Sequence, residues 1–167
     1  DIGFNLWVVA NITKDNEKLG LFFSELEKKG FQIEKKKISE KSIYSSFMYN
    51  RIKVRFEATF KKIPGSLKDY ETCEGNFLVI YTLTPEELIK EKVDACLNRR
   101  KIRDLYDIFF LLNYIKEISS IKSQLEKLIR EYKKPIDEKG LRVIILAGVV
   151  PEAKKMLYYI KGRIKNG

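Results

Sequence analysis

The segment of residues 84–112 restricts the fold of this chain more than any other, because it predicts two successive helices with defined ends. Thr84, Pro85 and Glu87 form a helix start. The threonine hydroxyl can cap a free N–H, proline fits the first turn, and a glutamate three residues after the cap can complete a capping box. We therefore expect one helix from 85 to the basic run at 99–101, and a second helix after that run.

One lysine of the first predicted helix lies in an apolar row. Lys92 shares an i, i+4 row with Leu88 and Cys96. A charged group there costs free energy unless its ammonium finds a partner or reaches solvent along its own stem. On the second predicted helix, Asp104 and Asp107 are spaced i, i+3 and share a face. An inward lysine, a basic turn and two acids could together bind a polyphosphate.

The same residues also have an ordinary interpretation. Arg100 and Asp104 are spaced i, i+4, which is the spacing of a surface ion pair. Arg103 and Asp107 have the same spacing, and such pairs contribute little to stability. Lys92 would then simply extend its ammonium into solvent. The pattern alone leaves both interpretations open.

The segment 83–112 resembles the C-terminal signature of the AbiEii/AbiGii-type nucleotidyltransferases, the toxin halves of toxin–antitoxin systems. The resemblance rests on the pattern P-E-E-L-x-x-E-K-x-x-A-x-x-x-R-x-x-x-R-D-L-Y-D. It implies a polymerase-β-like nucleotidyltransferase fold. It also implies a lysine, here Lys92, that contacts nucleotide phosphates, and an acid, Asp104 or Asp107, that is needed for activity. Arg99 and Arg100 of the basic run are further candidates for nucleotide binding.

The first ten residues alternate between polar and apolar side chains and predict a strand. In the family this strand carries D-x-D, whose two carboxylates can hold Mg²⁺ ions. Here the motif reads Asp1-Ile2-Gly3-Phe4, so the first acid is present and glycine replaces the second. The Gly-Gly-Thr or Gly-Ser turn that the family places before this motif is missing as well. The resemblance thus implies Asp1 as a metal ligand, in either a decayed copy or a piece of a longer enzyme.

A hairpin is expected over 44–60, with a tight connection at 49–51. Its second strand alternates strictly between apolar and polar residues, and Glu57 lies on the polar face. In the fold that the resemblance implies, the next central strand brings a third carboxylate to the metals, and Glu57 is the candidate. The alternative is a solvent-facing glutamate paired across the strands with Lys or Arg.

The remaining elements follow from periodicity. We expect a helix over 16–29, a strand over 31–38, a loop-rich stretch over 61–76 and a short buried strand over 77–81. Further on, we expect a helix with Ile121, Leu125 and Leu128 inward, and a last helix after Pro151 with Met156, Leu157 and Ile160 inward. The apolar run 141–150 is interpreted as a buried helix, with a strand as its rival.

Composition excludes several kinds of chemistry. The 167 residues contain no histidine, which excludes a Ser-His-Asp triad and every His-ligated metal site. Two cysteines are too few for a disulfide framework, which fits a reducing cytoplasm. No apolar run has the length of a membrane span.

The net charge is +10, and residues 116–167 carry 13 Lys and Arg against 6 Asp and Glu. A surface of this kind favours nucleic acid or another polyanion, although general solubility explains it equally well.

These observations predict an α+β chain, with a small mixed sheet of the nucleotidyltransferase type over 1–83 and a helical region over 84–167. The resemblance implies transfer of a nucleotidyl group from an NTP to an acceptor. Mg²⁺ is the expected cofactor, RNA a candidate acceptor and an antitoxin protein a candidate partner. The alternative is a catalytically inactive remnant of the fold that binds nucleotide, nucleic acid or a partner protein.

Overall fold

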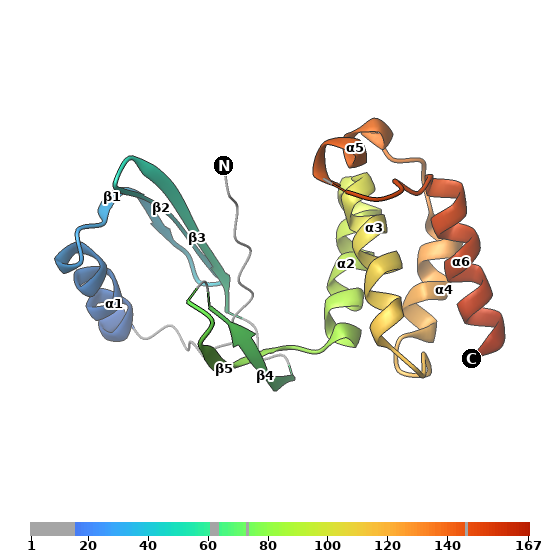
Figure 1. The fold of residues 1–167 in the computed structure, drawn as a ribbon, viewed down its shortest axis with the longest axis horizontal. Coiled ribbons are helices and arrows are strands. Elements are labelled where there is room, and N and C mark those ends of the chain that lie inside the picture. The colour runs from blue at the N-terminus through green and yellow to red at the C-terminus, as the bar shows by residue number, and fades with distance from the viewer. Residues whose placement is uncertain (1–15, 61–63, 73, 146) are drawn as a thin grey trace. The chain divides into compact units, whose positions relative to one another are not determined.

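The computed structural model describes residues 16–60, 64–72, 74–145 and 147–167. The chain divides into two compact units, Asp1–Thr82 and Leu83–Gly167, which we describe separately. Their elements are labelled in Figure 1. Helices and strands are both present, so the predicted α+β class is confirmed. Within the described ranges, no helix is both long and apolar enough to cross a membrane.

The first unit contains a three-stranded antiparallel sheet in the order β1-β2-β3. The strands are β1 (Gln32–Ile38), β2 (Ser42–Tyr49) and β3 (Ile52–Thr59). The predicted hairpin is confirmed: Tyr49 pairs with Ile52 across a two-residue connection. Both connecting residues, Asn50 and Arg51, have positive φ angles of 47° and 66°. Such a turn matches the twist of the strands that it joins.

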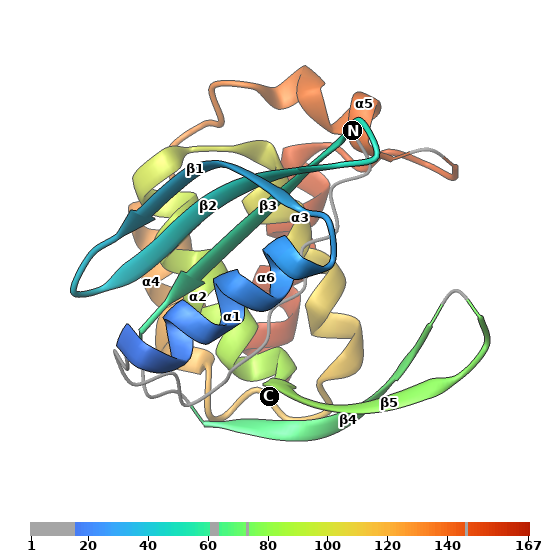
Figure 2. The ribbon, with the colours of Figure 1, turned by 90° about the vertical axis from the view of Figure 1, so that its left-hand side faces the viewer.

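Helix α1 (Asn16–Lys28) covers one face of this sheet, as Figure 2 shows. Leu19 and Phe23 on the helix pack with Ile43 and Phe47 on β2 to form a small buried cluster. The helix was predicted from the spacing of its apolar residues, and it ends before Gly30, whose φ of +90° suits glycine.

A two-stranded sheet follows, made of β4 (Gly65–Glu71) and β5 (Phe77–Leu83). The predicted loop over 61–76 is therefore wrong for residues 65–71. Gly65 begins a strand because it allows close approach: a Cβ there would lie 2.5 Å from the Thr82 carbonyl oxygen. The strand at 77–83 is confirmed but is not buried, since Phe77 and Val79 are 67% and 65% exposed.

Both described sheets are antiparallel. The strand predicted over residues 1–10, with Asp1 and Gly3, lies outside the described residues. The mixed sheet expected over 1–83 is therefore not seen in the described strands and stays a prediction.

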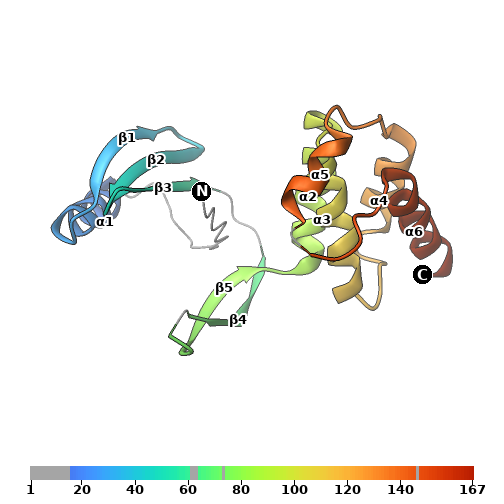
Figure 3. The same ribbon diagram turned by 45° about the horizontal axis from the view of Figure 1, so that its top comes forward.

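The second unit is a bundle of α2 (Pro85–Arg99), α3 (Ile102–Leu111), α4 (Lys122–Glu131) and α6 (Ala153–Asn166). Helix α2 packs against α3 and α4, and α6 packs against the same two helices. Figure 3 shows the bundle from a second direction. The predicted inward residues Leu125, Leu128, Met156 and Ile160 are all fully buried. Shorter elements complete the unit: η1 (Leu112–Tyr114), η2 (Glu138–Gly140) and α5 (Leu141–Ile144).

The apolar run at 141–150 is neither a buried helix nor a strand where it is described. Helix α5 ends at Ile144, and Gly148 adopts a φ of +94° before Pro151. Val143 and Val149 are 82% and 92% exposed. Apolar composition thus gave the wrong prediction here, because Leu141 alone among the described residues of the run is fully buried in the bundle core.

Candidate functional site

The start of α2 is fixed by its cap. The Thr84 hydroxyl accepts a hydrogen bond from the Glu87 backbone N–H at 3.3 Å, and Pro85 occupies the first turn as predicted. The predicted capping box forms only in part. The hydrogen bond from the Glu87 N–H to the Thr84 hydroxyl is made, whereas the Glu87 carboxylate accepts a hydrogen bond from the Lys90 Nζ at 2.6 Å. This cap fixes where α2 starts, and the buried residues Ile89, Val93 and Cys96 mark the face that packs in the bundle.

A two-residue turn joins α2 to α3. Arg100 ends α2 in the left-handed region, with φ 54° and ψ 39°. Its guanidinium donates to the Lys134 carbonyl oxygen from Nε at 3.3 Å and from Nη2 at 2.9 Å. The Ile136 N–H donates in return to the Arg100 carbonyl oxygen at 3.0 Å. The segment before η2 therefore holds the turn in place.

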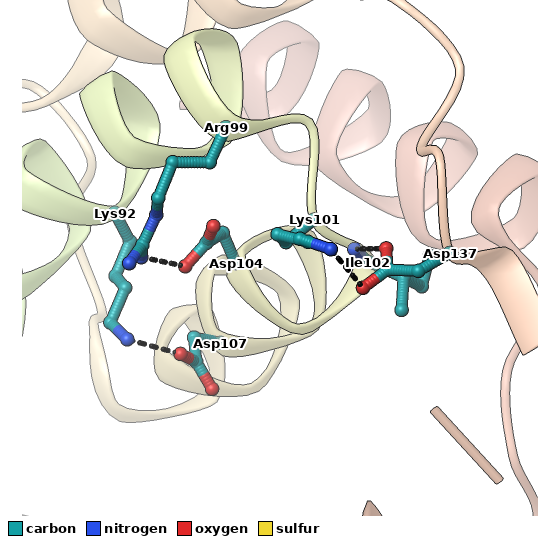
Figure 4. Close-up of polar contacts among 7 residues, drawn as sticks. All are labelled: Lys92, Arg99, Lys101, Ile102, Asp104, Asp107 and Asp137. Carbon is teal, nitrogen blue, oxygen red and sulfur yellow. Dashed lines mark hydrogen bonds and ion pairs between the residues drawn. The ribbon is translucent and has the colours of Figure 1, made fainter. Parts of the chain in front are cut away.

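Asp137 caps α3 from outside the helix. Its Oδ1 accepts a hydrogen bond from the Ile102 N–H at 2.8 Å, and its Oδ2 lies 3.5 Å from the Lys101 Nζ (Figure 4). Free N–H groups at a helix start favour such an acceptor. Asp137 was not predicted as a cap, because 35 residues separate it from Ile102 and no local pattern links them.

Two ion pairs join α2 to α3 at the predicted site. The Lys92 Nζ lies 2.5 Å from Oδ2 of Asp107, and the Arg99 Nη2 lies 2.7 Å from Oδ1 of Asp104 (Figure 4). The Lys92 side chain is only 22% exposed. The tight turn makes the helices antiparallel, so the earlier cation on α2 meets the later acid on α3. Lys92 therefore has an acidic partner within the bundle.

The pairs expected from i, i+4 spacing are not the ones that form. Among the described ion pairs, neither Arg100 with Asp104 nor Arg103 with Asp107 is present. Arg100 is engaged with the Lys134 carbonyl instead. The ordinary surface-pair interpretation is thus wrong in its choice of partners.

Asp104 is the most buried charged residue of the site. Its side chain is 0% exposed, and its Oδ2 is buried with no hydrogen-bond partner in the described part of the chain. It lies in the first turn of α3, where the helix dipole favours a negative charge. Its charge also acts on the buried free thiol of Cys96: burial, and then the Asp104 carboxylate, raise the pKa of Cys96 to about 11.

The two cations occupy one face of α2, seven residues apart, which is roughly 10 Å along a helix. Each is oriented by a carboxylate on α3. An ammonium is a compact donor, and a guanidinium presents a fork of donors that matches phosphate oxygens. The pairing therefore presents two oriented cations of the kind that binds phosphates.

An aromatic column runs along α3 and the following η1. Tyr106, Phe110 and Tyr114 follow one another at i, i+4 and i+8, with ring centroids 6.1 Å and 5.4 Å apart. Phe110 is 45% exposed and Tyr114 is 64% exposed. Exposed rings of this kind can stack on nucleobases. The i, i+4, i+8 spacing of these three rings is visible in the sequence, although no site was predicted from it.

A family model described as the nucleotidyl transferase AbiEii toxin of a type IV toxin–antitoxin system matches residues 10–154. The chain belongs to the AbiEii family. No curated protein and no solved structure matches it. The family match confirms the resemblance, and its range includes Lys92, Asp104 and Asp107. Asp1 and Gly3 lie before the matched residues, and most of α6 lies after them.

Glu57, the other predicted metal ligand, lies on β3 in the first unit. Its side chain is 57% exposed, and its Oε1 lies 3.7 Å from the Arg55 Nη1 two residues earlier on the same strand. Tyr44 is its partner across the strands, so the ion pair runs along the strand and not across it. Within the described residues, no three Asp, Glu or Cys side chains come together as a metal site. Glu57 alone is not a ligand set for the Mg²⁺ that the AbiEii resemblance implies.

Proposed function

We propose that this AbiEii-family protein transfers a nucleotidyl group from an NTP to a hydroxyl group of an RNA acceptor. The observation that supports it most directly is the ion pair between Lys92 and Asp107, in the segment that carries the family signature. Asp107 positions the Lys92 ammonium, which contacts the phosphates of the NTP. Asp104 positions Arg99, which supplies the second cation.

In this reaction the acceptor oxygen forms a bond to the α-phosphorus. The bond between that phosphorus and the oxygen bridging to the β-phosphate breaks, and pyrophosphate leaves with the electron pair. The acceptor proton passes to solvent. The contribution of Lys92 and Arg99 is electrostatic, because negative charge develops on the phosphate oxygens and fixed cations stabilise it.

Mg²⁺, the acceptor and the partner belong to the proposal as expectations. Mg²⁺ would accompany the triphosphate and neutralise part of its charge. RNA is favoured as the acceptor by the basic charge of residues 116–167. An antitoxin protein is the expected partner, since the family is one of toxin–antitoxin toxins.

The test is incubation of the purified protein with α-labelled NTPs, Mg²⁺ and total RNA. We expect label in RNA with the wild type and a loss of at least tenfold with Lys92→Ala. Lys127→Ala is the matched control, because Lys127 also pairs with an acid, Asp94, at 3.1 Å, but on the surface between α4 and α2. Equal activity of the Lys92→Ala and control variants would contradict the role given to Lys92.

A second candidate function is binding of nucleotide or RNA without turnover. Gly3 favours it, since the family's motif has its second acid at that position. The two functions separate in one experiment. If Gly3→Asp gives label transfer where the wild type gives none, the wild type is a binding protein; transfer by the wild type itself excludes this alternative.

A further inference from the structure

Helix α6 carries an unusual distribution of charge. Its sequence, AKKMLYYIKGRIKN, contains four lysines and one arginine and no acidic residue. Arg163 is used within the bundle, where it donates to the carbonyl oxygens of Leu112 and Ile115 at 2.7 Å and 2.6 Å. The lysines are different, because no ion pair to a described carboxylate is formed by any of them: Lys154, Lys155, Lys161 and Lys165.

Three of these lysines form a row with an exposed tyrosine. Lys154, Tyr158, Lys161 and Lys165 are spaced i, i+4, i+7 and i+11, so they lie on one face of the helix. We call this row the α6 stripe. Each of its lysines is exposed, and the Tyr158 ring is 81% exposed. The opposite side of α6 carries Ala153, Met156 and Ile160, which are buried in the bundle core.

This combination of groups is selective about its partner. A row of lysines attracts a phosphate backbone, and a solvated aromatic ring between them offers a stacking surface for a base. An acidic protein would be attracted by the lysines, but its carboxylates would gain nothing from stacking on the aromatic ring. Single-stranded RNA uses both groups, because its unstacked bases are free to lie on aromatic side chains.

We propose that the α6 stripe binds single-stranded RNA, with the lysines on its phosphates and a base stacked on Tyr158. The proposal deepens the function proposed above by giving the RNA acceptor a binding surface, and in that sense it rests on it. The stripe lies on α6, whereas the Lys92–Asp107 pair joins α2 to α3, and most of the stripe lies beyond the residues that the family model matches.

The test is the anisotropy of a fluorescent 12-nucleotide RNA titrated with the whole protein, without NTP, over a range of salt concentrations. A Lys154→Gln, Lys161→Gln, Lys165→Gln variant should bind at least tenfold more weakly. Its log Kd against log salt slope should be smaller by about 2, because each lost phosphate contact on a single strand is worth about 0.7. The matched control changes three exposed lysines elsewhere: Lys29→Gln, Lys41→Gln and Lys133→Gln.

The ring is tested separately. Tyr158→Ala should weaken RNA binding about tenfold, and Tyr158→Phe should leave it unchanged, because stacking needs the ring and not the hydroxyl. Tyr158 is 81% exposed, so these variants should fold as the wild type does.

Three results would overturn the proposal. Equal weakening by the stripe variant and by the control would mean a general effect of charge. An unchanged affinity with Tyr158→Ala, together with displacement of the RNA by polyglutamate, would assign the stripe to an acidic protein. Tighter binding of a DNA 12-mer of the same sequence would exclude RNA as the preferred ligand. Since the assay contains no NTP, loss of RNA binding is distinguishable from loss of nucleotidyl transfer.

Discussion

The Lys92 ammonium lies 2.5 Å from the Asp107 carboxylate, whereas Asp104, one helical turn before Asp107, pairs with Arg99. The two acids of the D-L-Y-D element therefore hold different cations of the same helix. They also differ in burial, since Asp104 is fully buried and Asp107 is 35% exposed. Substitutions at the two acids should consequently have different effects.

Arg99→Ala should lower the free energy of unfolding by about 2 kcal/mol, because it leaves the buried Asp104 carboxylate without its cation. Urea denaturation followed by circular dichroism measures it. Arg130→Ala is the control, since Arg130 and its partner Glu131 are 69% and 46% exposed and should contribute less than about 0.5 kcal/mol. Equal stability of the two variants would show that Asp104 does not depend on Arg99.

Asp137→Ala should cost about 1 kcal/mol of stability, because it removes the acceptor that caps α3 at the Ile102 N–H. Asp94→Ala removes an exposed ion pair only and should cost less than about 0.5 kcal/mol. Thermal unfolding of both variants compares them. The capping role is wrong if Asp137→Ala unfolds at the same temperature as Asp94→Ala.

The free energy of unfolding should depend on pH through the Cys96 thiol. Its pKa is raised from 9.0 to about 11, first by burial and then by the Asp104 charge. The folded protein therefore keeps a proton that the unfolded chain releases near pH 9. This contribution to stability is complete below pH 9 and is lost as the pH rises from 9 to 11.

Alkylation and unfolding measurements can both detect this effect in a Cys73→Ser background, in which Cys96 is the single cysteine. We expect slow alkylation of the folded protein at pH 9 and a fall in stability between pH 9 and 11 that Cys96→Ala reduces. Asp104→Asn should lower the pKa of the Cys96 thiol, since it removes the nearby negative charge. A thiol that alkylates at pH 9 as fast as a free cysteine would contradict this account.

The aromatic column should contribute to base binding. Phe110→Ala should weaken NTP binding about tenfold, because a stacked base is worth about 1–3 kcal/mol, and Phe110→Trp should preserve it. Competition with inorganic triphosphate is the internal control. If Phe110→Ala weakens triphosphate and NTP equally, the ring supports the fold and does not contact the base.

Local patterns predicted the elements of this fold well where a buried face or a specific turn decided them. The hairpin at 42–59 and the helix start at Thr84 are examples, since a two-residue turn and a cap are encoded by adjacent residues. Patterns failed for β4 and for residues 141–150. Most described side chains of both segments are exposed. No regular alternation of buried and exposed residues is therefore present from which hydrophobic periodicity could predict the structure.

The membership of the site was predictable, but its pairing was not. Lys92, Arg99, Asp104 and Asp107 were all identified from sequence, and α2 and α3 bring them together. Which acid holds which cation depends on the tight antiparallel turn at Arg100, and that turn is held by a segment about 35 residues further along the chain. No pattern within one helix contains that information.

The most direct test of the central claim is a double-mutant cycle on the affinity for fluorescent NTPs, using Lys92→Ala, Asp107→Ala and the two combined. If Asp107 acts by positioning Lys92, either single change should weaken binding. The double variant should then bind no more weakly than Lys92→Ala alone, because the two residues act as a unit. An Asp107→Ala protein that binds NTP as tightly as the wild type, or losses that simply add, would contradict it.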